Sequence, residues 1–248
     1  MEPAKQAGPD WRANLASAAA TMTLARPFVE KGDRRVEKQG SARPRYAEWG
    51  LKRVLDVTIA LTALLFLAPL LALIAIALIV QDGYPIHYRH TRIGRNGERF
   101  GCLKFRSMVR DADAQLRKLL EESPAARAEW AETQKLRRDP RIHFVGSLLR
   151  KSSLDELPQL INVLRGEMSI VGPRPIVAEE MERYQDKLAL YLAVRPGVTG
   201  LWQVSGRNDV SYDRRVSMDA EYVRSMSLGH DLFIVLKTGW VIFAGKGY

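Results

Sequence analysis

The sequence predicts a mainly α-helical protein with a small β-hairpin, an α+β class, attached to a membrane by one helical segment. Three observations lead to this prediction: an uncharged apolar run from Val57 to Val80, an Asn-Gly pair between two extended runs, and several segments whose apolar residues recur at helical spacing. Of the 248 residues, 46% are hydrophobic and 27% are charged, which excludes a disordered polymer and allows a buried core.

The charge balance and the cysteine count narrow the partners and the compartment. The 38 Lys and Arg residues outnumber the 28 Asp and Glu residues, so the formal net charge is +10. Such a chain is expected to meet a polyanion, which leaves nucleic acid, an anionic membrane surface and phosphorylated substrates as candidates. The single cysteine, Cys102, excludes an internal disulfide and a thiolate-based zinc site, so the cytosol is the expected compartment.

The apolar run is long enough, as a helix, to cross a hydrocarbon core of about 30 Å. It begins after 56 residues and lacks a small-residue cleavage pattern, so it is not a cleaved signal peptide. Lys52 and Arg53 precede the run, and four arginines follow it: Arg89, Arg92, Arg95 and Arg99. Positive charge on both sides favours two cytoplasmic ends. Pro69, near the middle, favours a bend. A re-entrant helix-break-helix and a kinked spanning helix both fit these observations.

Charged residues at the start of the run are expected to act at the membrane surface. Asp56 would cap the helix or pair with an arginine, and Lys52 and Arg53 would hold anionic headgroups. Three regions follow from this placement. Residues 1–50 are predicted to be a mobile cytoplasmic extension, residues 51–82 the membrane segment, and residues 83–248 a cytoplasmic or interfacial domain.

The hairpin is predicted where Asn96-Gly97 separates two extended runs, residues 86–88 and 100–105. Cations are dense from residue 88 to residue 110, and they include Lys104 and Arg106. This density suits phosphate oxygens or lipid headgroups, whereas a solvated basic surface is the simpler alternative. Two further helical regions are expected. Residues 108–138 predict two surface helices joined at Ser123-Pro124, and residues 232–243 predict a short interfacial or core helix, with the interface favoured by its Trp and Lys.

The most informative block is residues 148–175, LLRKSSLDELPQLINVLRGEMSIVGPRP. Its apolar residues recur at helical spacing, which predicts a helix from Leu154 to about Arg165 that ends at Gly166. Proline is tolerated in the first turn of a helix, so Pro158 must lie there. This places Asp155 and Glu156 at the helix N-terminus.

Two interpretations of these acids are open. The run from Ser153 to Glu156 matches the capping-box pattern, which gives the acids a purely structural role. The other interpretation is chemical, because Arg150 and Lys151 precede the acids and Arg174 follows them. A carboxylate kept ionised by cations is a usable nucleophile toward phosphorus, and an adjacent acid can hold a divalent metal or move a proton. The residues thus suggest phosphoryl chemistry at a membrane surface.

From about residue 51 to residue 248 the chain resembles the bacterial sugar transferase family, the monotopic polyprenyl-phosphate phosphoglycosyl transferases, and among them the members of exopolysaccharide synthesis. The motifs that carry the resemblance are, in order, KRVLD, the Pro69-broken apolar run, RHTRIGRNGERFGCLKFRSM, RKSSLDELPQLINVLRGEMSIVGPRP and RPGVTGLWQVSGRN. One departure is Ala68, where members often carry Ser before the helix-breaking proline. The bend is expected to survive on Pro69.

The resemblance implies transfer of a sugar-1-phosphate from a UDP-sugar, usually UDP-glucose or UDP-galactose, to undecaprenyl phosphate, with release of UMP. The family's Asp-Glu dyad falls on Asp155 and Glu156, so Asp155 is the expected nucleophile and a covalent aspartyl phosphosugar the expected intermediate. The resemblance also implies Mg²⁺ at this dyad, a re-entrant segment in contact with membrane lipids, and a place at the cytoplasmic face of the bacterial inner membrane. A homodimer is possible by analogy, and nucleic acid is not an expected partner.

Basic residues are the candidates for phosphate contacts: Arg150 and Arg174 first, then Lys104, Arg106 and Arg207. Two alternatives to the transferase are retained. A membrane-anchored basic adaptor without catalysis would not depend on the two carboxyl groups, and its binding would weaken strongly with salt. An enzyme that transfers only the sugar would release UDP instead of UMP.

Overall fold

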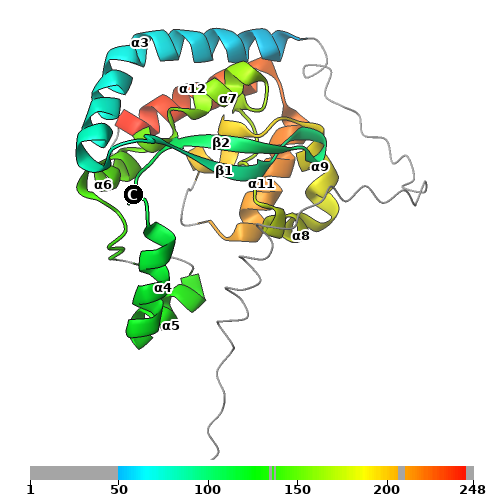
Figure 1. Ribbon diagram of the computed structural model, residues 1–248. Helices are drawn as coiled ribbons and strands as arrows, with labels where there is room; N and C mark the ends of the chain where they lie inside the picture. Colours follow the sequence, from blue (N-terminus) through cyan, green and yellow to red (C-terminus); the bar gives the residue numbers. More distant parts are fainter. Residues whose placement is uncertain (1–49, 134–135, 137, 206–209, 244–248) are drawn as a thin grey trace, which may run out of the picture. The chain divides into compact units, whose positions relative to one another are not determined.

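Helices form most of the structure and surround a long β-hairpin (Figure 1). The computed structural model describes residues 50–133, 136, 138–205 and 210–243. Apart from Gly50, the predicted N-terminal extension lies outside the described residues, and so does Arg207. The described part is therefore mainly helical with small sheets, as the sequence predicts.

The apolar run lies in one long helix, α3 (Leu51–Asp82), which ends at Gly83 in a positive-φ conformation. Figure 1 shows that α3 changes direction part-way along. Pro69 lies inside it, and a proline removes a helical hydrogen bond and clashes with the preceding turn. In its most apolar stretch only 11% of the residues are buried, and Phe66 is 81% exposed. The helix is long and apolar enough to serve as a membrane anchor.

Three charged residues fix the start of α3 to the rest of the domain. Lys52 Nζ lies 2.6 Å from the Asp231 carboxylate, which is fully buried. Arg53 donates to the carbonyl oxygens of Val163 and Leu164, at 2.5 and 2.9 Å. Asp56 accepts from Ser169 Oγ and from the Ile170 amide, both at 2.9 Å. The expectation that Asp56 caps the helix or pairs with an arginine is therefore wrong, because the domain supplies its partners.

The other end of α3 is fixed to the same domain. Arg106 donates to the carbonyl oxygens of Asp82, Gly83 and Pro85, and its guanidinium pairs with the Asp82 carboxylate at 3.0 Å. Ile74 and Leu78 pack in one buried cluster with Phe105 and Leu149. Both ends of the apolar helix thus contact one folded domain.

The predicted hairpin is confirmed. Strands β1 (His87–Ile93) and β2 (Arg99–Phe105) pair in antiparallel register, with Tyr88 opposite Lys104 and Arg92 opposite Phe100. The connecting turn, η1 (Arg95–Gly97), places Asn96 at φ 58° and Gly97 at φ 80°, the left-handed region that Asn and Gly tolerate best. The two helices expected to meet at Ser123-Pro124 are also present, as α4 (Ala112–Glu122) and α5 (Pro124–Thr133), and they project from the rest of the domain (Figure 1).

The prediction of one continuous helix over residues 154–165 is wrong for the residues before Gln159, which do not belong to that helix. Helix α6 (Phe144–Ser152) ends at Ser153, whose φ of 58° turns the chain sharply. A separate 3₁₀ turn, η2 (Leu154–Glu156), carries the two acids, and α7 (Gln159–Arg165) begins only after Pro158. The predicted end at Gly166 is confirmed, with φ 83°. Proline fits the N-terminal boundary of a helix, and here it separates η2 from α7 instead of lying inside one continuous helix.

Short segments complete the domain. Strands β3 (Ser169–Val171) and β4 (Gly197–Thr199) pair in parallel. The remaining helical segments are η3 (Ala178–Glu180), α8 (Met181–Tyr184), η4 (Gln185–Lys187), α9 (Leu188–Ala193), α10 (Leu201–Ser205), α11 (Tyr212–Ser225) and α12 (Leu228–Phe243). The main core joins α3, α7, α11 and α12 through Ala60, Val163, Tyr222 and Ile234, none more than 1% exposed. The start of the apolar helix α3 is therefore part of the domain core.

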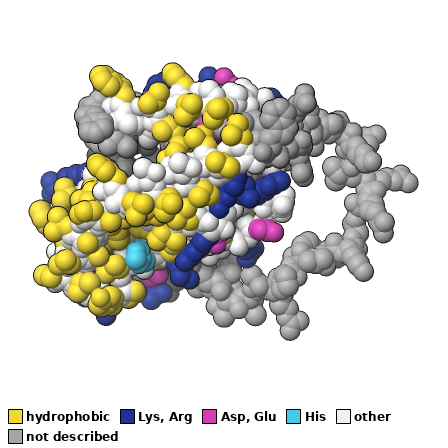
Figure 2. All heavy atoms as spheres, turned by 90° about the horizontal axis from the view of Figure 1, so that it is seen from above, with side chains coloured by type: hydrophobic (Ala, Val, Ile, Leu, Met, Phe, Trp, Pro, Cys, Tyr) yellow, Lys and Arg dark blue, Asp and Glu magenta, His cyan; other side chains and the backbone are white. Residues whose placement is uncertain are grey.

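The C-terminal helix α12 begins four residues before the predicted start, and it is buried on one side only. Asp231 and Ile234 are fully buried, whereas Leu236 and Trp240 are about three-quarters exposed. Figure 2, seen from the side of α3, shows hydrophobic side chains over much of the surface, with Lys and Arg side chains beside them. A helix with this exposed apolar side is not a core helix, so the interfacial alternative fits better.

Candidate active site

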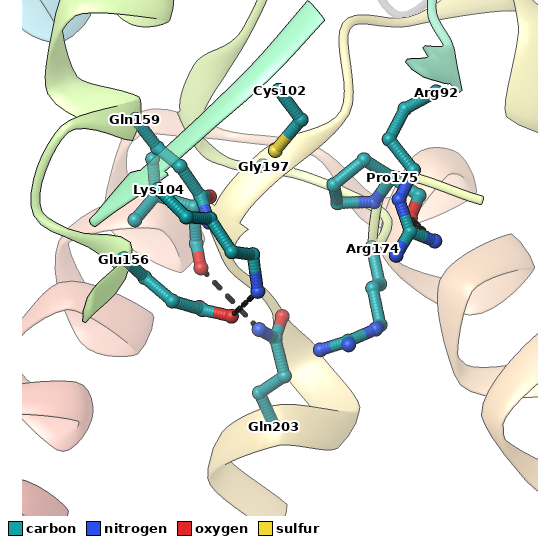
Figure 3. A pocket seen from close by; sticks show the side chains of 10 residues that line it. Arg92, Cys102, Lys104, Glu156, Gln159, Arg174, Pro175, Gly197 and Gln203 are labelled. Carbon is teal, nitrogen blue, oxygen red and sulfur yellow. Dashed lines mark hydrogen bonds and ion pairs between the residues drawn. The ribbon is translucent and has the colours of Figure 1, made fainter. Parts of the chain in front are cut away.

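The acidic turn η2, strand β2 and the segment after β3 meet at a pocket (Figure 3). Three cations line it, Arg92, Lys104 and Arg174, together with the acid Glu156 and the amides of Gln159 and Gln203. The three cations come from β1, β2 and the segment after β3, so only the fold brings them together with Glu156. With three cations and one acid in its lining, the pocket suits a ligand with more than one negative charge.

Glu156 is held by a short ion pair with Lys104. Its Oε1 accepts from Lys104 Nζ at 2.5 Å, and each side chain is about three-quarters buried. Burial alone would raise the pKa of Glu156, but the charges of Lys104 and Arg174 outweigh it and hold the pKa below its usual range. Glu156 is therefore a carboxylate at neutral pH, in contact with a cation on the hairpin.

Asp155, its neighbour, lies in a different environment. Asp155 is only 8% exposed. Burial, together with the charge of Glu156, raises the pKa of Asp155, while the charges of Lys104 and Arg150 act to lower it. A desolvated carboxylate next to cations is more reactive toward an electrophile than one in water. The two acids thus have opposite pKa shifts, a pattern that is typical of carboxyl pairs with different roles.

The capping-box interpretation of Ser153 to Glu156 is wrong. Ser153 has a left-handed backbone and makes no side-chain hydrogen bond to the turn that follows. The acids lie in a three-residue turn instead of the first turn of α7, so a helix dipole does not account for them. Their place is set by the sharp turn at Ser153 before them and by Pro158 after them.

Arg174 is positioned by its neighbours in sequence and by an aromatic ring. It lies between two prolines, and its guanidinium carbon is 5.9 Å from the centre of the Trp202 ring, within the range of a cation–π contact. Its charge lowers the pKa of Glu156, which agrees with its side chain pointing into the pocket in Figure 3. Arg174 and Lys104 are thus the two predicted phosphate contacts that the structure places in the pocket.

The other predicted cations lie elsewhere. Arg150 is exposed at the end of α6, where its charge lowers the pKa of Asp155 without lining the pocket. Arg106 directs its two terminal NH₂ groups to the end of α3, as described above, and Arg207 lies outside the described residues. Lys52 and Arg53, which are expected at anionic headgroups, bind partners within the domain, Asp231 and the carbonyl oxygens at the end of α7.

Sequence reasoning missed Arg92 and Cys102 as pocket residues. Arg92 donates to the Pro175 carbonyl oxygen at 3.2 Å and lies 3.7 Å from the Glu180 carboxylate, so its guanidinium is held beside Arg174. Strand alternation puts Arg92 and His90 on one face of β1, but that pattern could not show which face the pocket occupies. Burial raises the pKa of the Cys102 thiol, which makes it a neutral wall residue and a poor nucleophile.

A divalent metal fits the dyad only with help from a ligand. No group of three or more His, Cys, Asp or Glu side chains suited to a metal occurs within the described ranges. Mg²⁺ is commonly bound by one or two carboxylates, with phosphate oxygens and water completing its six ligands. Asp155 and Glu156 could supply these one or two carboxylate ligands, and the oxygens of a bound phosphorylated molecule and water would supply the other ligands.

Comparisons with known proteins find similar sequences over most of the chain. The family model described as bacterial sugar transferase matches residues 47–245. The chain is 55% identical over 196 residues to the exopolysaccharide production protein ExoY of Sinorhizobium fredii, covering 79% of this chain and 87% of that protein. It is 49% identical over 229 residues to the protein of the same name from Rhizobium meliloti, covering 92% and 98%. It is 50% identical over 197 residues to the undecaprenyl-phosphate galactose phosphotransferase of Salmonella typhimurium, covering 79% of this chain and 41% of that protein.

Proposed function

Because this chain belongs to the bacterial sugar transferase family, we propose that it transfers a sugar-1-phosphate from a UDP-sugar to undecaprenyl phosphate and releases UMP. The sugar is glucose or galactose, and the reaction is the first membrane step of exopolysaccharide repeat-unit synthesis. The observation that carries this proposal is the buried Asp155 beside a pocket whose lining holds three cations and Glu156.

In the first step, a carboxylate oxygen of Asp155 attacks the phosphorus atom that bears the sugar. The new bond joins Asp155 to that phosphorus, the bond to the bridging oxygen breaks, and UMP leaves with the electron pair. In the second step, an oxygen of undecaprenyl phosphate attacks the same phosphorus, which frees Asp155 and leaves a diphosphate-linked lipid. Arg92, Lys104 and Arg174 would bind the phosphate oxygens in both steps, because guanidinium and ammonium groups stabilise the charge that develops there.

Glu156 and a metal ion complete the proposed site. Glu156 stays ionised through its contact with Lys104, so it is suited to orient that cation and to share a divalent ion with Asp155. Mg²⁺, when bound, would neutralise the transferring phosphate. Asp155 and Glu156 are the residues that would hold it.

The membrane placement is part of the same proposal. Both ends of α3 contact one domain, the first through Lys52 and Arg53 and the last through Arg106. A helix that crossed the bilayer would place its ends on opposite sides, where one domain does not reach both. The contacts therefore support a re-entrant segment that enters and leaves at the cytoplasmic face of the inner membrane, with Pro69 at its bend.

The reaction is tested by measuring UMP release from the purified protein in detergent with undecaprenyl phosphate, Mg²⁺ and each of several UDP-sugars. We expect UMP from UDP-glucose or UDP-galactose, and no UMP from Asp155→Asn, which removes the nucleophile and keeps the shape of the side chain. Asp213→Asn, at an exposed position of α11, is the matched control and should keep full activity. Release of UDP would indicate transfer of the sugar alone. UMP release by Asp155→Asn at the wild-type rate would refute the proposed role of Asp155.

A further inference from the structure

Three arginines that are distant in sequence come together beside the start of α3. Arg53 lies in the first turn of α3, Arg95 in the hairpin turn η1, and Arg195 just after α9, against which η1 packs. We call them the arginine triad. The triad is separate from the cations that line the pocket, Arg92, Lys104 and Arg174.

Backbone carbonyl oxygens at the end of α7 hold two members of the triad. Arg195 Nε donates to the Gly166 carbonyl oxygen at 2.7 Å, and Arg53 donates to the Val163 and Leu164 carbonyl oxygens. The negative end of the α7 helix dipole compensates part of this positive charge. Both guanidiniums are thereby fixed at one place, with further N–H groups left over.

The triad carries more positive charge than its surroundings balance. Burial, and then the charges of Arg95 and Arg53, lower the pKa of Arg195, and the acid that acts against them is Asp56. Asp56 is only 2% exposed, and its carboxylate already accepts from Ser169 and Ile170. Arg95 Nε is buried and has no hydrogen-bond partner among the described residues. A buried charged donor without a partner is costly, so the arrangement calls for an anion.

We propose that the arginine triad binds the phosphate group of an anionic phospholipid at the point where α3 enters the membrane. The position favours a lipid over a free ion, because the following turns of α3 expose large apolar side chains, Leu61, Leu65 and Phe66. In Figure 2, Lys and Arg side chains border the hydrophobic surface on this face. Guanidinium groups bind phosphate through paired N–H donors, and a headgroup phosphate lies at the edge of the hydrocarbon region. The inference rests on the membrane placement of α3 proposed above.

The test is a calorimetric titration of the purified full chain, in non-ionic detergent, with dihexanoylphosphatidylglycerol. Arg95→Gln is the informative variant, because Arg95 makes no hydrogen bond through Nε that the fold would lose. Arg99→Gln removes the same charge from an exposed position of the same hairpin and is the matched control. Circular dichroism confirms that each variant is folded. Lys104→Gln separates binding at the pocket from binding at the triad.

We expect Arg95→Gln to weaken phosphatidylglycerol binding about tenfold, as is typical for loss of a charge-assisted hydrogen bond, and Arg99→Gln and Lys104→Gln to change it less than about twofold. Inorganic phosphate and dihexanoylphosphatidylcholine should bind much more weakly than phosphatidylglycerol. Equal affinity for inorganic phosphate would overturn the lipid assignment, and unchanged binding by Arg95→Gln would overturn the site. Neither result bears on sugar-phosphate transfer, which the UMP measurement tests separately.

Discussion

Lys104 Nζ on the β-hairpin lies 2.5 Å from Glu156 Oε1 on the acidic turn η2. This contact connects two segments that are about 50 residues apart and fixes the dyad against β2. The same ammonium group also lowers the pKa of Asp155, so one cation acts on both acids. The ionisation state of the proposed nucleophile therefore depends on the hairpin as well as on its own turn.

Lys104→Met should lower the rate of UMP release and shift the acid limb of its pH profile. Asp155 must be ionised to attack, so activity falls as the pH drops through its pKa. Loss of the lysine charge raises that pKa further, which moves the fall in kcat/KM to higher pH. The measurement is the pH profile of kcat/KM for the UDP-sugar. Lys118→Met, at an exposed position of α4, is the control. An acid limb at the same pH in Lys104→Met and wild type would contradict the proposed action of Lys104 on the pKa of Asp155.

Arg92→Gln should raise KM for the UDP-sugar. Arg92 is held beside Arg174 in the pocket, and a charge-assisted hydrogen bond contributes about 1.5–3 kcal/mol, so a rise of about tenfold or more is expected. Arg89→Gln is the matched control, because Arg89 lies on the same strand, is exposed and points to the other face. Steady-state UMP release gives both constants. Similar KM values for the two variants would argue against a substrate contact at Arg92.

The sequence predicts the local features that depend on neighbouring residues, and it misses those that depend on packing. The hairpin turn at Asn96-Gly97 and the helix end at Gly166 follow from backbone preferences of single residues, and both are confirmed. The partners of Lys52, Arg53 and Asp56 are more than 100 residues away, so no local pattern could identify them. The same limit applies to Arg92, whose place in the pocket depends on the segment after β3.

The dyad shows both sides of this limit. The acid pair and its flanking cations identify the two residues, but the sequence predicts one continuous helix where the chain forms the separate turn η2 and then α7, after a sharp turn at Ser153. A serine at φ 58° is uncommon, because the left-handed region is unfavourable for residues other than Gly, Asn and Asp. Tertiary contacts such as the one between Lys104 and Glu156 must stabilise the turn, and these contacts are invisible in the sequence.

Asp219→Asn should stabilise the fold at neutral pH. Burial raises the pKa of Asp219 to about 7, although a 2.8 Å hydrogen bond from Tyr184 acts against it. The folded state then holds a proton that the unfolded state has lost, so the free energy of unfolding decreases as the pH rises from about 4 to 7. Asn keeps an acceptor for Tyr184 and does not titrate. Each pKa unit corresponds to about 1.4 kcal/mol, so the variant should gain a few kcal/mol over wild type across this range.

Thermal unfolding in detergent, followed by intrinsic fluorescence between pH 4 and pH 7, measures this difference. The wild-type Tm should decrease relative to that of the variant as the pH rises. Asp186→Asn, at an exposed position of η4, is the control and should follow the wild type. Parallel curves for wild type and Asp219→Asn would show that Asp219 is not a protonated, buried acid.

If α3 is re-entrant, as proposed, Pro69→Ala should convert part of the population into a straight spanning helix, because the proline that causes the bend is removed. The contacts at both ends of α3 oppose this change, since a straight helix must release one end from the domain. Removing the contacts at the start with Lys52→Met and Arg53→Met should therefore increase the spanning fraction above that of Pro69→Ala alone.

Single cysteines at Leu51 and Gln81 report the position of each flank by labelling in intact cells, and Cys102 is too buried to interfere. In the wild type both flanks should be labelled only after the cells are permeabilised. Labelling of one wild-type flank in intact cells would contradict the re-entrant topology, and unchanged labelling in the triple variant would show that Pro69 does not determine it.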